Sequence, residues 1–140
     1  MKKTDKVFLG GTTNETTWRD DVIKELQEHN VDYFDPVVDD WDETSQANEI
    51  NEKENLCNIH LYVITSAMLG VYSIAEIVES AFNNDVTTIA QVIPEGFNEN
   101  QLYSLKAVLD LANRHGAITC INQEPAYLIK QFITRSNNNI

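Results

Sequence analysis

The sequence has 140 residues, of which 42% are hydrophobic and 23% are charged, and its formal net charge is −12. This length and composition predict a single globular domain with a packed core. The negative charge argues against a nucleic-acid or anionic-membrane partner, because both bind to basic surfaces.

Targeting and metal-binding signals are not found in the sequence. The first residues run straight into a short apolar segment, and we find neither a secretory leader nor an apolar run long enough to span a bilayer. Cys57 and Cys120 are isolated, so neither a zinc site nor a disulfide framework is expected. We therefore expect a cytoplasmic protein that needs no metal and no cofactor.

The chain alternates short apolar runs with segments of helical periodicity, separated by turn residues. In chain order the predicted elements are a strand at 6–9, a helix at 18–29, a strand at 32–34, an acidic loop at 37–48, a short polar helix at about 47–56, a strand at 59–64, a helix at 73–82, a strand at 87–92, a helix from 99 that Gly116 ends, a strand at 117–121 and a helix at 125–134.

Strands that alternate with helices predict an α/β protein with a parallel sheet covered on both faces. Right-handed crossovers favour a flavodoxin-like three-layer sandwich with five strands in the order 2-1-3-4-5. We expect this domain to span residues 1–135 and residues 136–140 to form a mobile polar tail. The predicted order places the switch point, where open α/β sheets bind ligands, between the first and third strands.

The turn after the first strand is rich in glycine. Gly10, Gly11 and Thr12 can approach a phosphate or a sugar closely, since glycine has no side chain and a helix start offers free N–H groups. A tight turn between strand and helix also needs glycine, so both interpretations stay open. The turn matches neither the dinucleotide-binding fingerprint nor a P-loop.

The loop after the second strand combines carboxylates with an aromatic ring. It contains Asp35, Asp39, Asp40 and Trp41. A tryptophan can stack on a base or a sugar while an aspartate accepts hydrogen bonds from the ligand. Most acidic loops are only solvated, but a tryptophan is unusual in such a loop, so we expect ligand contact here.

The third predicted strand leads through a loop into a helix that carries Glu76. Thr65, Met68 and Tyr72 are expected to line the crevice, and Glu76 to face it from the first helical turn. Ser73 and Glu76 also spell a capping box, in which Glu76 would only bond a backbone N–H. Alternatively, the helix dipole keeps Glu76 ionised. An ionised carboxylate beside a nucleoside can attack the anomeric carbon, as in retaining glycosidases.

Several of these stretches together resemble the nucleoside 2-deoxyribosyltransferase family, in particular its divergent deoxyribosyltransferase-like branch. They are residues 8–12, 18–19, 35–41, 61–65 and 72–76. The resemblance implies a flavodoxin-like enzyme that cleaves the N-glycosidic bond of a 2′-deoxynucleoside or its phosphate. Glu76 matches the nucleophile of that family, which forms a covalent deoxyribosyl intermediate and releases it to another base or to water. The resemblance also implies a homo-oligomer whose neighbouring subunit completes the site.

The chain departs from the pattern of the family at three positions. Gly70 stands where the transferases carry an aspartate, Phe8 replaces a tyrosine, and Ile50 replaces another aspartate between Glu49 and Glu52. These departures remove groups that would assist the nucleophile and protonate the base.

Two hypotheses follow from this pattern. In the first, an enzyme uses Glu76 as nucleophile and Asp39 or Asp40 to protonate the base. In the second, the same crevice binds a nucleotide without chemistry, as a sensor. A flavin-binding loop built from residues 12–14 stays open as well, whereas glycines after the first strand exclude a phospho-receiver.

Overall fold

The computed structural model of the chain describes residues 2, 4–13, 17–38 and 41–138. Five parallel strands form one sheet in the order β2-β1-β3-β4-β5. They are β1 (Lys6–Gly11), β2 (Asp32–Phe34), β3 (Ile59–Ile64), β4 (Thr87–Val92) and β5 (Ile118–Ile121). The predicted flavodoxin-like α/β fold and its strand order are therefore confirmed.

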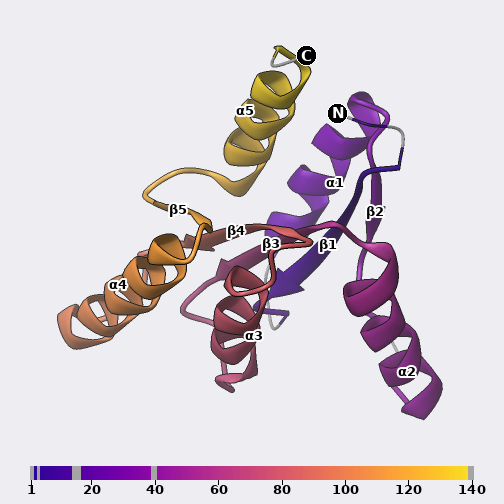
Figure 1. The fold of residues 1–140 in the computed structure, drawn as a ribbon. Helices are drawn as coiled ribbons and strands as arrows, with labels where there is room; N and C mark the ends of the chain where they lie inside the picture. The colour runs from indigo at the N-terminus through magenta and orange to yellow at the C-terminus, as the bar shows by residue number, and fades with distance from the viewer. Residues whose placement is uncertain (1, 3, 14–16, 39–40, 139–140) are drawn as a thin grey trace.

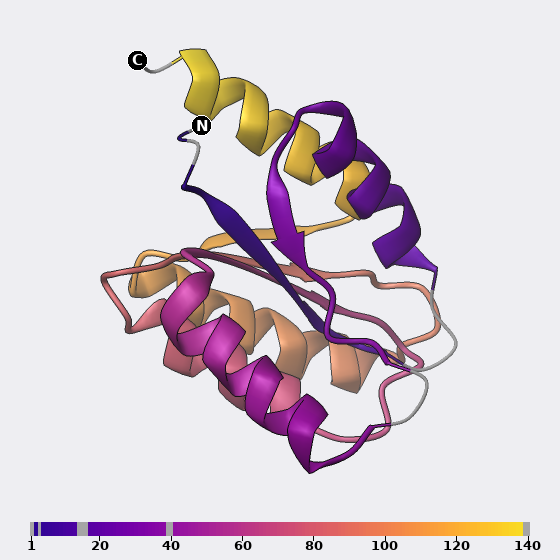
Figure 2. The same cartoon turned by 90° about the vertical axis from the view of Figure 1, so that its right-hand side faces the viewer.

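Helices cover both faces of the sheet (Figures 1 and 2). The helices are α1 (Trp18–Glu28), α2 (Glu43–Asn51), a π-helical segment η1 (Glu52–Leu56), α3 (Tyr72–Ala81), α4 (Glu99–Arg114) and α5 (Pro125–Asn138). Figure 2 shows α1 and α5 on one face and α2, α3 and α4 on the other. Among the described residues, none of these helices is both long and apolar enough to cross a bilayer.

The core consists of two apolar layers, one on each face of the sheet. All six residues of β3 are buried, so this strand is covered from both sides. Leu61 packs with Leu26 of α1 and Ile129 of α5 on one face. Tyr62, the next residue, packs with Ile77 of α3 on the other face, because successive side chains of a strand point in opposite directions.

Two predicted helix starts were wrong. The acidic loop was expected to extend to residue 48, but α2 begins at Glu43, because the Asp42 side chain accepts a hydrogen bond from the Ser45 amide at 2.8 Å. The capping box of Ser73 is not formed either. Helix α3 begins at Tyr72 with Val71 as its N-cap, and no side chain caps it.

Other boundaries agree more closely with the sequence. Asn98 and Gln101 form a capping box at the start of α4, as the position of Asn98 predicts. Helix α5 starts at Pro125 as expected but continues to Asn138, so residues 136–138 belong to its last turns rather than to a tail.

Candidate active site

A hollow of about 540 Å³, here called the main cavity, lies where β1 and β2 end and α3 begins. Its size is within the range of small-molecule sites. Its lining comprises Phe8, Gly10, Gly11 and Thr13 from β1 and the turn after it, Arg19 from α1, Pro36, Val37, Val38, Trp41 and Glu49 from the segment after β2 and from α2, and Tyr72, Ser73 and Glu76 from α3. The cavity therefore occupies the predicted switch point of the sheet.

Most of the predicted site residues lie together at this end of the sheet. Gly10, Gly11, Trp41, Tyr72, Ser73 and Glu76 line the main cavity. A second hollow of about 120 Å³ shares Gly11, Tyr72 and Ser73 with it and adds Thr12 and Met68. The loop after β3 thus borders the same crevice as the loop after β1.

Some predicted residues have a structural role, and two cannot be placed. The amide of Thr65 donates a hydrogen bond to Thr12 Oγ1 at 3.0 Å, which joins the two loops. The side chain of Asp35 accepts a hydrogen bond from the Val37 amide at 3.0 Å, so it shapes the turn after β2. Asp39 and Asp40 lie outside the described residues.

The two glycines of β1 are required by close contacts. A Cβ atom at Gly10 would lie 2.5 Å from the Tyr62 ring, closer than van der Waals contact allows. Gly11 has a φ of +105°, and a Cβ atom there would collide with the backbone of Val63. The tight-turn interpretation is therefore supported, and the same turn presents the glycines to the main cavity.

Glu76 faces the cavity from the second turn of α3, one turn later than predicted. Its side chain is 7% exposed, and its Oε2 atom lies 2.9 Å from Nζ of Lys53 in η1. The ammonium group also lies 5.6 Å from the centre of the Tyr72 ring. The charge that faces Glu76 thus belongs to a lysine side chain rather than to the helix terminus.

Burial and ion pairing shift the pKa values of Glu76 and Lys53 in opposite directions. Burial raises the pKa of Glu76 above its ordinary value, and the hydrogen bond from Lys53 opposes this rise. Burial lowers the pKa of Lys53, but the bond and the charge of Glu76, together with the charges of Tyr72 and Glu79, outweigh it and the pKa is raised. An ammonium group at 2.9 Å favours the ionised form of the Glu76 carboxylate.

A buried hydrogen-bond network centred on His60 fixes the backbone of Lys53. Nε2 of His60 lies 2.9 Å from the carbonyl oxygen of Lys53, and Nδ1 lies 2.9 Å from Ser80 Oγ. A carbonyl only accepts, so Nε2 carries the proton and Nδ1 accepts from Ser80. Burial lowers the pKa of His60, which favours this neutral form. His60 therefore fixes the backbone at Lys53.

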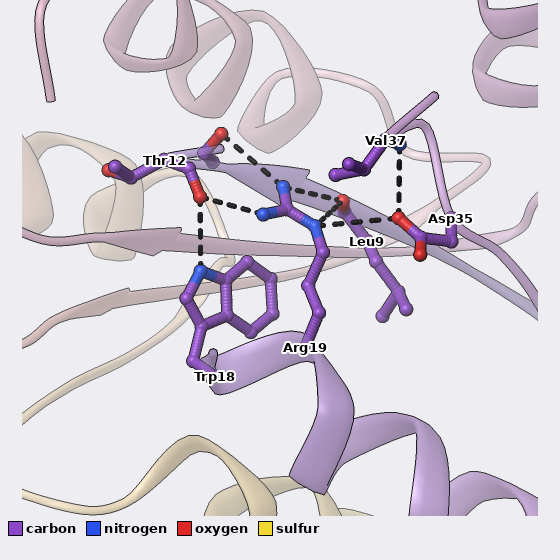
Figure 3. A network of polar contacts seen from close by, with 7 residues as sticks. Leu9, Thr12, Trp18, Arg19, Asp35 and Val37 are labelled. Atoms are coloured by element: carbon purple, nitrogen blue, oxygen red, sulfur yellow. Dashed lines mark hydrogen bonds and ion pairs between the residues drawn. The ribbon is translucent and has the colours of Figure 1, made fainter. Parts of the chain in front are cut away.

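Arg19 ties the end of β1 to α1 (Figure 3). Its buried guanidinium donates hydrogen bonds to the carbonyl oxygens of Leu9, Gly11 and Thr12, at 2.7 to 3.4 Å. The indole N–H of Trp18 donates to the same Thr12 carbonyl at 3.1 Å. Burial lowers the pKa of Arg19 to about 10, although the negative charge of Asp35 partly offsets this shift. Arg19 therefore sets the shape of the glycine turn.

The cavity is acidic and offers no metal site in the described part of the chain. Glu49 of α2 and Glu76 of α3 both line it. No group of three His, Cys, Asp or Glu side chains among the described residues is arranged to hold a metal ion.

The sequence was compared with protein families, curated proteins and solved structures. The sequence profile of the family described as nucleoside 2-deoxyribosyltransferase like matches residues 4–94. The chain belongs to this family. The match runs from before β1 to just after β4 and takes in every residue that lines the main cavity. No curated protein and no solved structure matched the chain.

The sequence did not predict three residues of this deoxyribosyltransferase-like site as site residues. Lys53 stands in the polar run from 51 to 55, where no apolar periodicity marks a buried side chain. Arg19 lies in one of the stretches that carry the family resemblance. Its hydrogen bonds to backbone carbonyls of β1 could not be predicted from the sequence, because every residue has a carbonyl group. Glu49 was noted only as a neighbour of Ile50, and the start of α2 at Glu43 places it on the cavity wall.

Proposed function

We propose that the protein cleaves the N-glycosidic bond of 2′-deoxynucleosides or deoxynucleotides and transfers the deoxyribosyl group to another base or to water. The observation that carries this proposal is the buried carboxylate of Glu76, which lines the main cavity in a chain of this family. Its ion pair with Lys53 favours the ionised form, which a carboxylate nucleophile requires.

In the first step, an oxygen of Glu76 attacks C1′ of the sugar. The bond between C1′ and the base nitrogen breaks, and its electron pair leaves with the base, which takes up a proton. In the second step, another base or a water molecule attacks C1′, gives up a proton and displaces the carboxylate. Asp39 or Asp40 is the proton donor that we propose from the sequence.

The walls of the cavity suit the two parts of such a substrate. Val37, Val38 and Trp41 line the cavity and expose apolar surface on which a base can stack. Gly10 and Gly11 offer a close backbone approach on the side of β1, where the sugar would lie within reach of Glu76.

A base-release assay tests the proposal. The protein is incubated with a panel of deoxynucleosides and their 5′-monophosphates, with and without a second free base, beside Glu76→Ala and Glu79→Ala. Glu79 is an exposed carboxylate on the same helix, so it controls for the loss of a charge. We expect base release that Glu76→Ala abolishes and Glu79→Ala preserves. Turnover by Glu76→Ala would rule out this mechanism, and base exchange would separate a transferase from a hydrolase.

A second candidate is a nucleotide-binding module without catalysis. It is favoured by the short ion pair, since a carboxylate oxygen bonded to Lys53 is a weaker nucleophile than a free one. Phe8 also lacks the hydroxyl group that the family places in this strand. Nucleotide binding by calorimetry with no base released on long incubation would support this candidate, and any base release would exclude it.

We also propose that the protein acts as a homo-oligomer, as the resemblance implies, and that it works in the cytoplasm, as we expect from its isolated cysteines. The loop between β3 and α3 exposes Leu69 and Val71, which are 88% and 74% exposed near the mouth of the cavity. Apolar side chains gathered beside a site are typical of a subunit contact. Sedimentation analysis of the wild type and of Leu69→Glu/Val71→Glu tests this, and an unchanged monomer would contradict it.

A further inference from the structure

Lys53 is tied to α3 through both its side chain and its backbone. Its Nζ atom donates a hydrogen bond to Oε2 of Glu76 at 2.9 Å. Its carbonyl oxygen lies 2.9 Å from Nε2 of His60, whose Nδ1 atom lies 2.9 Å from Ser80 Oγ, four residues after Glu76 on the same helix. The ammonium group therefore has one defined position beside a carboxylate that lines the main cavity.

The π-helical turn of η1 provides the carbonyl group for this second connection. The amide of Cys57 donates to the carbonyl oxygen of Glu52 at 2.7 Å, five residues earlier in the chain. In an α-helix the same amide would donate to the carbonyl oxygen of Lys53, four residues earlier. The π turn leaves that oxygen to His60. Irregular turns of this kind are frequent at functional sites.

The ion pair between Lys53 and Glu76 is shielded from competing groups. The carboxylate next to Lys53 in the chain, that of Glu52, is paired with Lys6 at 2.9 Å. The side chains of Lys53 and Glu76 are only 8% and 7% exposed, so water screens their attraction weakly. A charge-assisted hydrogen bond in such a place is strong, and its strength depends on how much charge the carboxylate carries.

The hydrogen bond from Lys53 distinguishes the two oxygens of Glu76. Oε2 accepts this bond, whereas Oε1 has no hydrogen-bond partner in the part of the chain that the structure describes. An oxygen without a bound donor is the better nucleophile, so Oε1 is the atom that would attack C1′. Oε2 would then become the carbonyl oxygen of the ester between the sugar and Glu76.

We propose that Lys53 is a positioning residue that promotes the breakdown of this ester. When the bond between C1′ and Oε1 breaks, its electron pair returns to the carboxylate, and the ammonium group stabilises the negative charge that grows on Oε2. The incoming base or water forms the new bond to C1′ and returns a proton to the group that protonated the leaving base, while Lys53 keeps its own protons. This inference rests on the proposed function, because it assumes that Glu76 is the nucleophile.

The same hydrogen bond opposes the first step of the reaction. The carboxylate loses negative charge as Oε1 attacks C1′, so the bond to Lys53 is stronger before the attack than in the transition state. Lys53 therefore slows the formation of the ester and speeds its breakdown. The wild type should then be limited by the first step and should hold little ester during turnover.

The breakdown of the isolated ester tests this role. A 2′-fluorinated arabinosyl nucleoside with a good leaving base lets the ester accumulate, because the fluorine slows both steps while the first stays faster. After the excess substrate is removed, a free base is added, and mass spectrometry follows the loss of the sugar from the protein. The formation of the ester is measured in parallel, at about pH 8.5 to favour the ionised form of Glu76.

The variants separate the charge of Lys53 from its place in the structure. We expect Lys53→Gln to slow ester breakdown by about 10²- to 10³-fold and ester formation by much less. Lys53→Gln keeps a donor beside Glu76, so it should be more stable than Lys53→Met. Lys53→Arg keeps the charge and should restore most of the rate of breakdown. Lys106→Gln, which removes an exposed lysine of α4, should change neither step.

The outcomes also separate this inference from the proposed function. Equal slowing of both steps in Lys53→Gln, unchanged breakdown, or equally slow breakdown in Lys53→Arg would overturn the inference. A burst of base release from an unfluorinated deoxynucleoside by the wild type would overturn it without any variant, because the ester would then accumulate. A wild type that forms no ester and releases no base would overturn the proposed function as well, whereas an ester on Glu76 would preserve the nucleophile.

Discussion

The Nζ atom of Lys53 lies 2.9 Å from Oε2 of Glu76, and both side chains are buried. This pair joins the π-helical segment before β3 to the helix after it. A lone carboxylate in such a place would be driven toward its neutral form, whereas the ammonium group favours the charged form that a nucleophile needs. The conformation of η1 therefore decides whether Lys53 can stabilise the charged form of Glu76.

We predict that Lys53→Met destabilises the protein more than a double change does. Removal of the lysine leaves Glu76 buried without a partner, which costs about 3–5 kcal/mol. Lys53→Met/Glu76→Leu removes both charges, so its cost should be smaller than that of Lys53→Met. Urea unfolding of the single and double variants measures these differences. A loss below about 1 kcal/mol in Lys53→Met would show that water solvates the carboxylate.

The sequence predicts the sheet well because burial leaves a local pattern. The run from Ile59 to Ile64 is apolar on both faces, which is typical of a central parallel strand, and the structure confirms it. The end of β1 and the loop after β3 then follow from topology alone. Gly10, Tyr72 and Glu76, which the sequence predicts at one crevice, line one cavity.

Contacts between segments distant in sequence leave no such pattern. Lys53 and Glu76 are 23 residues apart, and nothing in a polar run predicts that a lysine in it is buried. The capping box of Ser73 failed because the N-cap of α3 is Val71, two residues earlier, so Glu76 lies beyond the capping position and lines the cavity. Likewise, Asp42 lies among other acidic and polar residues, so the sequence does not mark it as the N-cap of α2. Its hydrogen bond with the Ser45 amide starts the helix there.

We predict that His60 makes stability depend on pH. Its pKa is lowered in the folded protein, so the unfolded chain binds a proton more readily below the ordinary value of 6.5. The stabilisation by His60 is therefore complete above pH 6.5 and is lost as the pH falls, with a slope of at most about 1.4 kcal/mol per pH unit. His60→Gln retains a donor toward Lys53 without titrating.

The free energy of unfolding, measured by urea titration from pH 8 to pH 5, checks this dependence. The wild type should lose more stability than His60→Gln over this range. Parallel curves for the two proteins would contradict the neutral, proton-donating form of His60 in the network.

We predict opposite effects for two glycine substitutions near the site. Gly11→Ala should destabilise the protein by more than about 1 kcal/mol, because φ is +105° and the new Cβ atom meets the Val63 backbone. A Cβ atom at Gly70 meets no heavy atom within 4 Å, so Gly70→Ala should be neutral or slightly stabilising. Thermal unfolding of both variants measures the difference, and equal melting temperatures would contradict the required turn at Gly11.

We predict that the protein prefers an unphosphorylated deoxynucleoside to its 5′-monophosphate. Arg19 is the cation that lines the cavity among the described residues, and its N–H groups already bond carbonyl oxygens of β1. The carboxylate of Glu49 repels a phosphate from the same cavity, and the one ammonium group beside it among the described residues, that of Lys53, is paired with Glu76. The ratio of kcat/KM for the two substrates should be about tenfold or more at low salt and smaller at high salt. A faster reaction with the monophosphate would contradict this electrostatic argument.

The most direct test of the proposed nucleophile is detection of the covalent intermediate. The electron-withdrawing fluorine of a 2′-fluorinated arabinosyl nucleoside destabilises positive charge at C1′ and slows both steps. With a good leaving base the first step stays faster than the second, so the covalent intermediate accumulates. Mass spectrometry of the digested protein then shows which residue carries the sugar. We expect one sugar attached to Glu76 in the peptide from α3, and none in Glu76→Ala or on the exposed Glu79. A sugar on another residue, or base release with no adduct in the wild type, would contradict Glu76 as the nucleophile.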